Sequence, residues 1–243
     1  MDSNSPSINL VVPCAGRGER AGRAMPKQYA TIASKPMIAH TLNALLQVSS
    51  IQTVGLLVSP GDVFINSILV DHALSNNPRI KVIPKGGATR AESVLAGLQY
   101  FKDLGALDEG WILVHDAARC LITPQSVEKL IQTCLSDPVG GLLAYPVADT
   151  LKESQSGRVE RTIQRGGKWL AQTPQMFRLG MLMKALNRAK EQRLDSITDE
   201  SSAIEALGES PVLVEGASAN FKITYPSDFE IAEALINYRS GKA

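Results

Sequence analysis

The residues best suited to chemistry lie in a glycine-rich segment near the amino terminus. Residues 14–27 carry four basic side chains and one acidic side chain, a local net charge of +3 in a 243-residue chain whose total net charge is +1. Gly16 and Gly18 let the backbone approach an anion closely and present successive N–H groups to it. With Arg20 and Lys27 close by, the segment predicts a polyphosphate site. The alternative is a tight turn with solvated basic residues beside it.

A dinucleotide site is a competing interpretation of the same glycines. Gly16, Gly18 and Ala21 satisfy the spacing G-x-G-x-x-A. That motif needs a helix that opens at the second glycine, and Pro26 would interrupt such a helix after about two turns. The second predicted strand, which ends near Ser59, also lacks the terminal acid that would hold a ribose. The sequence therefore disfavours a nicotinamide-dependent oxidoreductase.

Two other polar motifs follow predicted strands. Residues 85–93, Lys-Gly-Gly-Ala-Thr-Arg-Ala-Glu-Ser, form a glycine turn that opens a helix, and its N–H groups and Ser93 could read a base or a ribose. Asp116 could hold Mg²⁺ or a ribose hydroxyl, since Mg²⁺ commonly takes one or two carboxylates together with substrate phosphates. The alternatives are a plain turn with Arg90 on the surface, and a helix-capping Asp116 with His115 packed in the core.

The remaining candidates are weaker on composition alone. Arg165 and Lys222 each place a cation where charge could be neutralised, although an exposed Arg and a strand Lys more often have no such role. Cys14 and Cys120 flank the polar motifs, but no histidine or carboxylate is spaced to activate either thiol as a nucleophile. Both cysteines are interpreted as packing residues.

These motifs need strands and helices to position them, and the apolar pattern predicts both. Several apolar runs (LVV, VGLLV, WILV) are continuous, as in strands that are covered on both faces. Their alternation with amphipathic stretches predicts a three-layer α/β/α sandwich around a mostly parallel, Rossmann-like sheet. The predicted strands are Ile8–Pro13, Thr53–Ser59, Arg79–Ile83, Trp111–His115 and Gly141–Pro146. The predicted helices lie near 36–48, 62–75, 90–102 and 124–135.

Residues 147–177 break this pattern. They are polar, carry turn signals at Ser156-Gly157 and Gly166-Gly167, and alternate weakly, which predicts a hairpin that projects from the body. An arm with little core of its own is usually stabilised by a partner, so we expect a homodimer through this arm. We expect one domain over residues 1–243. The later elements are predicted as helices near 179–193 and 198–207, strands at 211–215 and 220–224, and a closing helix from about 227.

Composition excludes several classes of protein. With 44% hydrophobic and 20% charged residues the chain is not broadly disordered, and near-neutral charge argues against a nucleic-acid partner. Three cysteines without C-x-x-C spacing argue against a disulfide framework or a zinc ribbon. No apolar run is long enough to span a membrane, and the first residues lack the basic region of a signal peptide. We therefore expect a cytoplasmic protein with no membrane partner.

Taken in order, the motifs resemble one family. Between Asn9 and Leu235 the chain contains P-x-A-G-x-G-x-R, P-K-Q, G-G-x-x-R-x-x-S, H-D-A-A-R, D-T, T-P-Q, I-T-D-E and N-x-K-I-T. This ordered set resembles the 2-C-methyl-D-erythritol 4-phosphate cytidylyltransferases, the CTP-using enzymes of the non-mevalonate isoprenoid route. The resemblance implies a nucleotidyltransferase-type fold, with Mg²⁺ as the cofactor. It also implies transfer of a cytidylyl group from CTP to methylerythritol phosphate, giving 4-diphosphocytidyl-2-C-methyl-D-erythritol and pyrophosphate.

The resemblance also implies roles for individual residues. The residues that would act on the phosphates are Arg20, Lys27 and Lys222, with Lys222 at the reacting α-phosphate. The residues that would surround the nucleotide are Ala15, Gly16, Gly18, Gly87, Ala88, Ser93 and Asp116, with Asp116 also the magnesium ligand. The residues that would bind methylerythritol phosphate are Arg119, Thr150 and Arg165, the last two across the dimer interface.

The chain departs from the family pattern at three positions. Cys14 replaces a usual alanine, Glu19 reduces the local positive charge, and Ala219 replaces a common acid just before Asn220. None of these changes removes a residue that the resemblance assigns to the chemistry. Two alternatives stay open: a cytidylyltransferase for another sugar phosphate, notably ribitol 5-phosphate, and a non-catalytic nucleotide-binding regulator.

Overall fold

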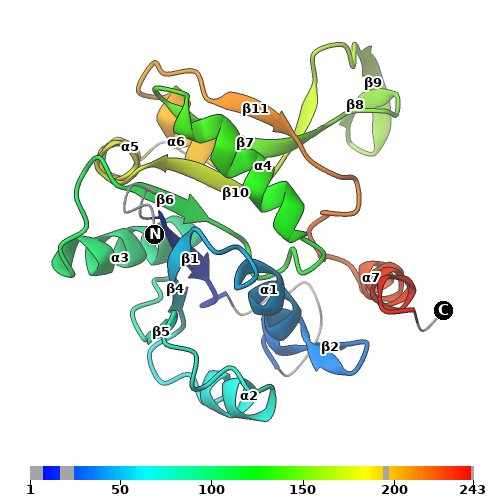
Figure 1. Ribbon diagram of the computed structural model, residues 1–243. Helices are drawn as coiled ribbons and strands as arrows, with labels where there is room; N and C mark the ends of the chain where they lie inside the picture. The colour runs from blue at the N-terminus through cyan, green and yellow to red at the C-terminus, as the bar shows by residue number, and fades with distance from the viewer. Residues whose placement is uncertain (1–7, 17–24, 194–196, 242–243) are drawn as a thin grey trace.

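A seven-stranded sheet forms the centre of the protein (Figure 1). The structure is a computed structural model that describes residues 8–16, 25–193 and 197–241. Neighbouring strands are parallel except in the two pairs that involve β10, so the predicted mostly parallel sheet is confirmed. From one edge to the other the strands are β11 (Val212–Glu215), β7 (Gly140–Pro146), β10 (Trp169–Arg178), β6 (Trp111–Val114), β1 (Ile8–Pro13), β4 (Ile51–Leu57) and β5 (Ile80–Ile83).

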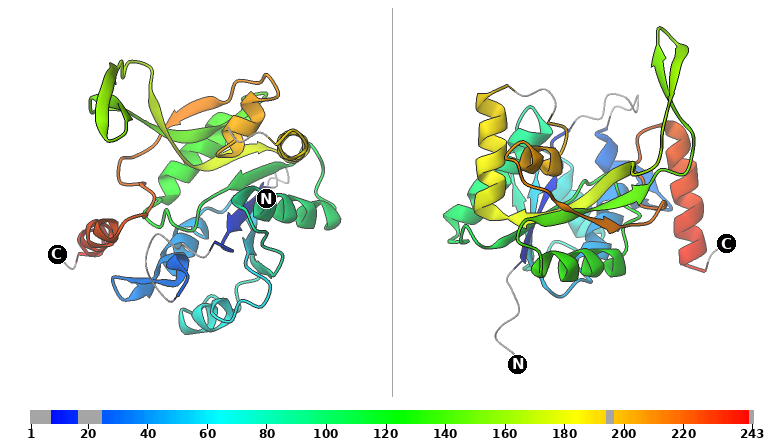
Figure 2. Two further views of the ribbon diagram at one scale, coloured as in Figure 1. Left: turned by 180° about the vertical axis from the view of Figure 1, so that it is seen from behind. Right: turned by 90° about the horizontal axis from the view of Figure 1, so that it is seen from above.

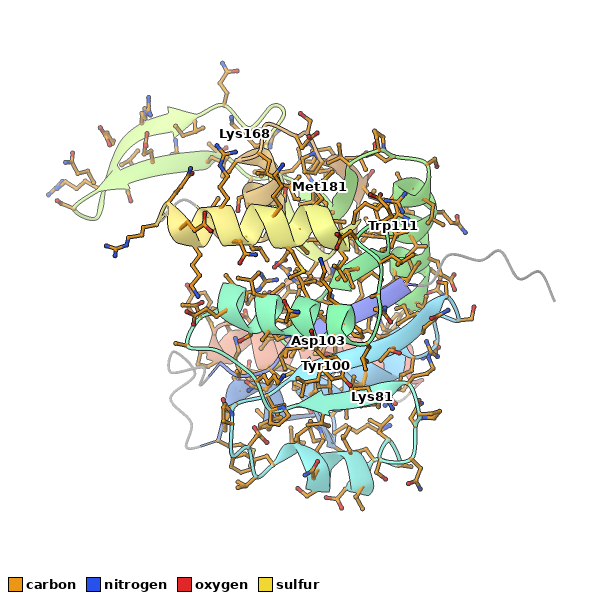
Figure 3. All side chains as sticks on the ribbon, turned by 90° about the vertical axis from the view of Figure 1, so that its left-hand side faces the viewer. Lys81, Tyr100, Asp103, Trp111, Lys168 and Met181 are labelled. Atoms are coloured by element: carbon orange, nitrogen blue, oxygen red, sulfur yellow. The ribbon has the colours of Figure 1, made fainter. Side chains whose placement is uncertain are left out.

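Helices cover both faces of the sheet, which confirms the three predicted layers. Consecutive side chains of β1 point into different cores, Leu10 and Val12 to one side and Val11 to the other, because side chains alternate along a strand. The helices on the first side are α1 (Met37–Leu45), α2 (Ile65–Asp71) and α4 (Pro124–Leu135). Those on the second side are α3 (Arg90–Asp103), α5 (Leu179–Glu191) and α6 (Glu200–Glu205). Figure 3 shows α3, which carries Tyr100 and Asp103, alongside α5, which carries Met181.

A smaller third core joins the C-terminal helix to the loop after β6. Helix α7 (Pro226–Arg239) packs against β2 (Thr31–Ile32), which pairs with β3 (Lys35–Pro36). The N–H of Ile223 donates to the carbonyl of Ala118 at 2.9 Å. This bond brings the segment before α7 to the carboxyl end of β6, although the two are far apart in the sequence.

The predicted arm is shorter than expected. Strands β8 (Leu151–Gln155) and β9 (Arg158–Ile163) form a separate two-stranded sheet that projects from the body, and Ser156-Gly157 is its turn, with φ of 50° and 77° (Figure 2). The expectation that the arm extends to residue 177 is wrong, because β10 is a strand of the central sheet between β6 and β7. Gln172, Thr173 and Gln175 are polar but buried, and this polarity hid the strand.

A second correction concerns residues 220–224, for which the sequence predicts a strand. The segment pairs with no strand in the described part of the chain and is irregular. Burial does not follow the alternation of polar and apolar residues here: Asn220 and Ile223, three positions apart, are buried, while Lys222 is half exposed. The helix predicted at 198–207 is also shorter, since α6 spans Glu200–Glu205 after an Asp199 cap.

Candidate active site

A cavity of about 290 Å³ lies beyond the carboxyl ends of β1, β5 and β6. Strand β1 has β4 and then β5 on one side and β6 on the other, so this is the point where the strand order reverses, the usual ligand site of open α/β sheets. A larger cavity, about 610 Å³, lies at the opposite strand ends around Trp111 and Arg178, and no predicted site residue that the structure describes lines it. Location and lining both favour the smaller cavity as the reaction site.

Most of the predicted nucleotide and phosphate residues come together here. The ones that line the cavity are Ala15, Gly16, Lys27, Gly87, Ala88, Ser93, Asp116 and Lys222. Gly18 and Arg20 lie outside the described residues. Arg119, Thr150 and Arg165 do not line the cavity.

Two side-chain hydrogen bonds fix the backbone of the loop after β1, which lines the cavity. The side chain of Gln28 donates to the Cys14 carbonyl at 2.5 Å, and the Ser59 hydroxyl donates to the Ala15 carbonyl at 3.1 Å. A Cβ added to Gly16 would meet no atom of the described residues within 4 Å. Burial raises the pKa of the Cys14 thiol, which keeps this cavity-lining cysteine protonated and unreactive.

The turn between β5 and α3 also lines the cavity, and it begins beside the β1 loop, since a Cβ on Gly86 would meet the side chain of Ala15. The Gly87 N–H donates to the Ser93 hydroxyl at 3.0 Å, and that hydroxyl donates in turn to the Thr89 carbonyl at 3.0 Å. Thr89 also caps α3 in a reciprocal pair with Glu92. Ser93 thus lines the cavity and at the same time fixes the shape of the glycine turn.

Asp116 is the centre of an ion network at the base of the cavity. Its Oδ1 lies 2.8 Å from Nε of Arg90 and its Oδ2 lies 2.8 Å from Nζ of Lys222. Burial alone would raise the pKa of Asp116, but the two neighbouring cations outweigh burial and hold the pKa well below its usual range. The helix-capping alternative is wrong, since the side chain bonds to Arg90 and Lys222 and caps no helix. Asp116 is therefore a fixed, ionised carboxylate.

Glu200, which appeared in the I-T-D-E motif without an assigned role, completes this network. Its two carboxylate oxygens accept from the terminal nitrogens of Arg90 at 2.6 and 2.9 Å, and its side chain is 1% exposed. Arg90 is therefore not the surface residue of the alternative interpretation. The available signal was the helical spacing of Glu200 with Ala203 and Ile204, which places an acid on a buried helix face.

The two lysines reach the cavity from opposite ends of the sequence. Lys27 begins a short 3-10 helix (Lys27–Tyr29), and its Nζ donates to the Ile223 carbonyl at 2.6 Å. That carbonyl belongs to the residue after Lys222. Two positive side chains thus border one cavity, as the polyphosphate interpretation requires.

His115 and Thr173 anchor the backbone of Asp116. The Asp116 N–H donates to Oγ1 of Thr173 at 3.0 Å, and Thr173 Oγ1 lies 3.0 Å from Nδ1 of His115. Nε2 of His115 is 3.3 Å from the Arg119 carbonyl, an acceptor, so the ring carries its proton on Nε2 and accepts from Thr173 at Nδ1. Burial lowers the pKa of His115 to about 4, which confirms its interpretation as a neutral core residue.

Arg119 lies beside the cavity with its guanidinium already engaged. It donates to the Asn220 carbonyl at 2.8 Å and to the Ala171 carbonyl at 3.2 Å, and burial lowers its pKa. Asn220, to which the sequence analysis assigned no role, is buried and donates to Oε1 of Gln172 at 3.1 Å and to the Thr173 carbonyl at 2.9 Å. These bonds tie the loop that carries Lys222 to β10.

Thr150 and Arg165 lie at the base of the projecting hairpin. Both are exposed, and the guanidinium of Arg165 donates to the carbonyl of Ala148. Within one chain the structure does not bring them to the cavity.

The described residues contain no group of three or more His, Cys, Asp or Glu side chains placed to hold a metal ion. Asp116 is the one carboxylate among the described residues that line the cavity. In the same part of the chain no helix has both the length and the apolar character of a membrane span.

Comparison with known proteins agrees with the resemblance seen in the motifs. The family model for 2-C-methyl-D-erythritol 4-phosphate cytidylyltransferase (IspD) matches residues 8–238. An enzyme of that name from Paraburkholderia phytofirmans is 47% identical over 231 residues, 93% of this chain and 94% of its own length. A bifunctional enzyme IspD/IspF from Albidiferax ferrireducens is 50% identical over 236 residues, which span 97% of this chain but only 54% of that protein.

Solved structures agree as well. A crystal structure of 4-diphosphocytidyl-2C-methyl-D-erythritol synthase superposes with a TM-score of 0.81 at 36% identity, covering 96% of this chain and 99% of the other. The Francisella tularensis 2-C-methyl-D-erythritol 4-phosphate cytidylyltransferase gives a TM-score of 0.79 at 32% identity, covering 94% and 99%.

Proposed function

Because the chain belongs to the 2-C-methyl-D-erythritol 4-phosphate cytidylyltransferase family, we propose that it transfers the cytidylyl group of CTP to that sugar phosphate. The products are 4-diphosphocytidyl-2-C-methyl-D-erythritol and pyrophosphate, and the reaction serves non-mevalonate isoprenoid synthesis. The observation that carries the proposal is the convergence of Lys27, Lys222 and the Gly16 loop on one cavity at the reversal point of the sheet.

The reaction is an in-line displacement at the α-phosphate of CTP. A phosphate oxygen of the acceptor forms the new P–O bond while the bond between the α-phosphate and the pyrophosphate breaks. The attacking oxygen is already an anion, so the site needs no general base and no covalent intermediate. This agrees with a protonated Cys14 and a His115 whose ring nitrogens are both engaged.

The work of the site is then positioning and charge neutralisation. Two like-charged reactants must approach each other, and Lys27 and Lys222 offset that repulsion. We assign the triphosphate to Lys27 and to the N–H groups of the loop at Ala15 and Gly16, and the α-phosphate to Lys222. Gly18 and Arg20 keep the triphosphate role that the family resemblance implies. The cytidine is assigned to Gly87, Ala88 and Ser93, which line the same cavity.

Asp116 is the residue proposed to hold Mg²⁺. A single carboxylate fits a cation that takes most of its ligands from substrate phosphates and water, and Asp116 is ionised and borders the cavity. When bound, the cation would neutralise charge on the triphosphate and on the leaving pyrophosphate. Lys222 would release Oδ2 of Asp116 and turn toward the α-phosphate.

The acceptor is proposed to lie between Arg119 and the arm of a second copy of the chain. Thr150 and Arg165 are exposed polar residues at the base of that arm. Val159 on the arm and Leu170 at the start of β10 are exposed apolar residues, 64% and 56% exposed. Such a surface supports a homodimer in which each arm completes the other copy's site. Both substrates are highly charged and water-soluble, which supports a cytoplasmic location.

The decisive experiment is a pyrophosphate-release assay with CTP and methylerythritol phosphate, with and without Mg²⁺. Parallel reactions contain ribitol 5-phosphate, or CTP alone. We expect release only with methylerythritol phosphate and the metal. Release with ribitol 5-phosphate alone would reject the acceptor, and CTP binding without turnover on either acceptor would indicate a regulator.

A further inference from the structure

The buried carboxylate of Glu200 is separated from the cavity by a single side chain, that of Arg90. The residue is 0% exposed, and Arg90 is its ionic partner, joined by two parallel bonds of 2.6 and 2.9 Å. A buried carboxylate is costly unless it is paired in this way. Glu200 itself does not line the cavity, whereas Arg90 does.

The backbone around Glu200 is fixed by its sequence neighbours. Asp199 caps α6 by accepting from the Ser202 N–H at 2.9 Å, and it also accepts from the side chain of Gln175 at 2.8 Å. The other side-chain atom of Gln175 accepts from the Ser201 N–H at 2.7 Å. Since Gln175 belongs to β10, both neighbours of Glu200 are tied to the central sheet.

Arg90 connects the fixed Glu200 to Asp116. The guanidinium group is planar, so two bonds from its terminal nitrogens to Glu200 set the direction of its Nε–H. That Nε donates to Oδ1 of Asp116 at 2.8 Å, which leaves Oδ2 facing Lys222 and the cavity. The four side chains Glu200, Arg90, Asp116 and Lys222 carry two negative and two positive charges, so the network is neutral.

We propose that Glu200 is a positioning residue, which acts through Arg90 to hold the Asp116 carboxylate in its working orientation. The inference rests on the proposed function, in which Asp116 serves the bound nucleotide. Without Glu200, the terminal nitrogens of Arg90 lose their acceptors. They can then hydrogen-bond to both oxygens of Asp116 or turn into the cavity. Either movement takes Oδ2 away from its place beside Lys222.

The first test compares Glu200→Gln with Glu205→Gln. Both substitutions remove one negative charge from α6, but Glu205 is exposed and bonds to Ser201 rather than to Arg90. We expect Glu200→Gln to lower kcat/KM by about 10- to 100-fold, because this is the usual effect of losing a residue that supports a ligand or of misplacing a reacting group by about 1 Å. Glu205→Gln should change kcat/KM by less than about 3-fold. Equal effects of the two substitutions on kcat/KM would contradict the proposal. Arg90→Lys, which keeps the charge but loses the planar fork, should match Glu200→Gln.

The second test separates positioning from general loss of structure. Glu200→Gln is made again in an Asp116→Asn background, and CTP affinity is measured by calorimetry in all four proteins together with turnover. If Glu200 acts through Asp116, the second substitution adds less than about a 3-fold change to the first, because the two effects are not additive. Fully multiplicative effects would overturn the proposal. If Glu200→Gln does not fold, Arg90→Lys replaces it in the same cycle.

The two readouts keep this inference separate from the proposed function. Absence of turnover by the unaltered protein with CTP and methylerythritol phosphate would reject the proposed function. The cycle in CTP affinity would still decide whether Glu200 and Asp116 are coupled.

Discussion

The ammonium group of Lys222 lies 2.8 Å from the carboxylate of Asp116, and both residues line the cavity. Lys222 comes from an irregular loop, and Asp116 comes from the end of β6. A lysine held by this ion pair samples few rotamers before the substrate binds, so less side-chain entropy is lost when it turns to a phosphate group.

The first prediction concerns the two cavity lysines. Lys222→Ala or Lys27→Ala should lower kcat by about 10²- to 10³-fold, the effect of removing one donor that stabilises developing charge. Pyrophosphate release under saturating substrates measures it. Lys81→Ala, an exposed lysine on β5, is the matched control and should leave kcat unchanged. Normal turnover by either cavity variant would remove that lysine from the mechanism.

The second prediction concerns acid stability. His115 titrates near the ordinary histidine pKa of 6.5 when the chain is unfolded and at about 4 when it is folded, so between these values the unfolded chain binds more protons. The free energy of unfolding should therefore fall as the pH falls from 6.5 to 4, by about 3 kcal/mol at most from this group. Asp116 contributes in a lower pH range, since its folded pKa is depressed and its stabilisation is lost as it becomes protonated.

Urea unfolding across this pH range measures the His115 contribution. His115→Gln removes the titrating group, so the variant should lose less unfolding free energy than the unaltered protein between pH 6.5 and 4. His72→Gln, at a partly exposed histidine that follows α2, serves as the control and should keep the full pH dependence. Identical slopes for His115→Gln and the unaltered protein would show that burial of His115 does not cause the effect.

The third prediction concerns Asn220, whose amide joins the Lys222 loop to β10. Asn220→Ala leaves the side-chain oxygen of Gln172 and the carbonyl of Thr173 without this donor. We expect a loss of about 1–3 kcal/mol in the free energy of unfolding, the cost of buried unsatisfied polar groups. Denaturant titration measures that loss. Asn43→Ala, an Asn on α1 whose side chain is in no described bond, should change stability by less than about 0.5 kcal/mol.

The fourth prediction concerns the arm and the second copy. Arg165→Ala should raise KM for methylerythritol phosphate about 10-fold or more and leave KM for CTP nearly unchanged, because only the acceptor side loses a charge-assisted contact. Arg158→Ala, a residue near the hairpin tip, is the control. If the two KM values rise together, Arg165 does not act on the acceptor alone.

Mixing two damaged variants tests the exchange of arms directly. Lys222→Ala damages a cavity and Arg165→Ala damages an arm, so a mixed dimer regains one intact site if arms serve the opposite copy. Activity of the mixture above that of either variant is expected after subunit exchange. Unchanged activity, with mixed dimers demonstrated, would place both residues in the same copy's site.

The fifth prediction concerns the divalent cation. Chelation should abolish pyrophosphate release, and added Mg²⁺ should restore it. Asp116→Asn should raise the Mg²⁺ concentration needed for half-maximal rate, because the cavity loses the carboxylate proposed to hold the ion. A rate that is independent of added cation after chelation would remove the metal from the proposal.

The sheet could be predicted from the sequence where local pattern and fold agree. Continuous apolar runs such as Trp111–Val114 lie between two helical layers, and turn chemistry placed Ser156-Gly157 correctly. Strand β10 was missed because its buried polar residues find partners far away in the sequence: Gln175 bonds to Asp199 and Thr173 to His115. Bonds between residues so far apart leave no periodic pattern in the local sequence.

The site residues also divide into those with a local sequence signal and those without one. Gly16, Lys27 and Asp116 could be singled out because glycine turns and charges at strand ends have a local signature. Glu200 could not be assigned a role, since its partner Arg90 is 110 residues away and only the fold brings them together. The predicted strand at 220–224 failed for a related reason: Asn220 is buried by side-chain bonds to β10 and not by a strand ladder.

Strand β10 connects the projecting hairpin to the parts of the chain that form the site. Its first residues follow the projecting hairpin after the turn at Gly166-Gly167, and Gln172, Thr173 and Gln175 further along bond to the Lys222 loop, the Asp116 backbone and the start of α6. One strand thus starts near the base of the hairpin and holds three separate parts of the interior. A displacement of this strand would act on all three at once.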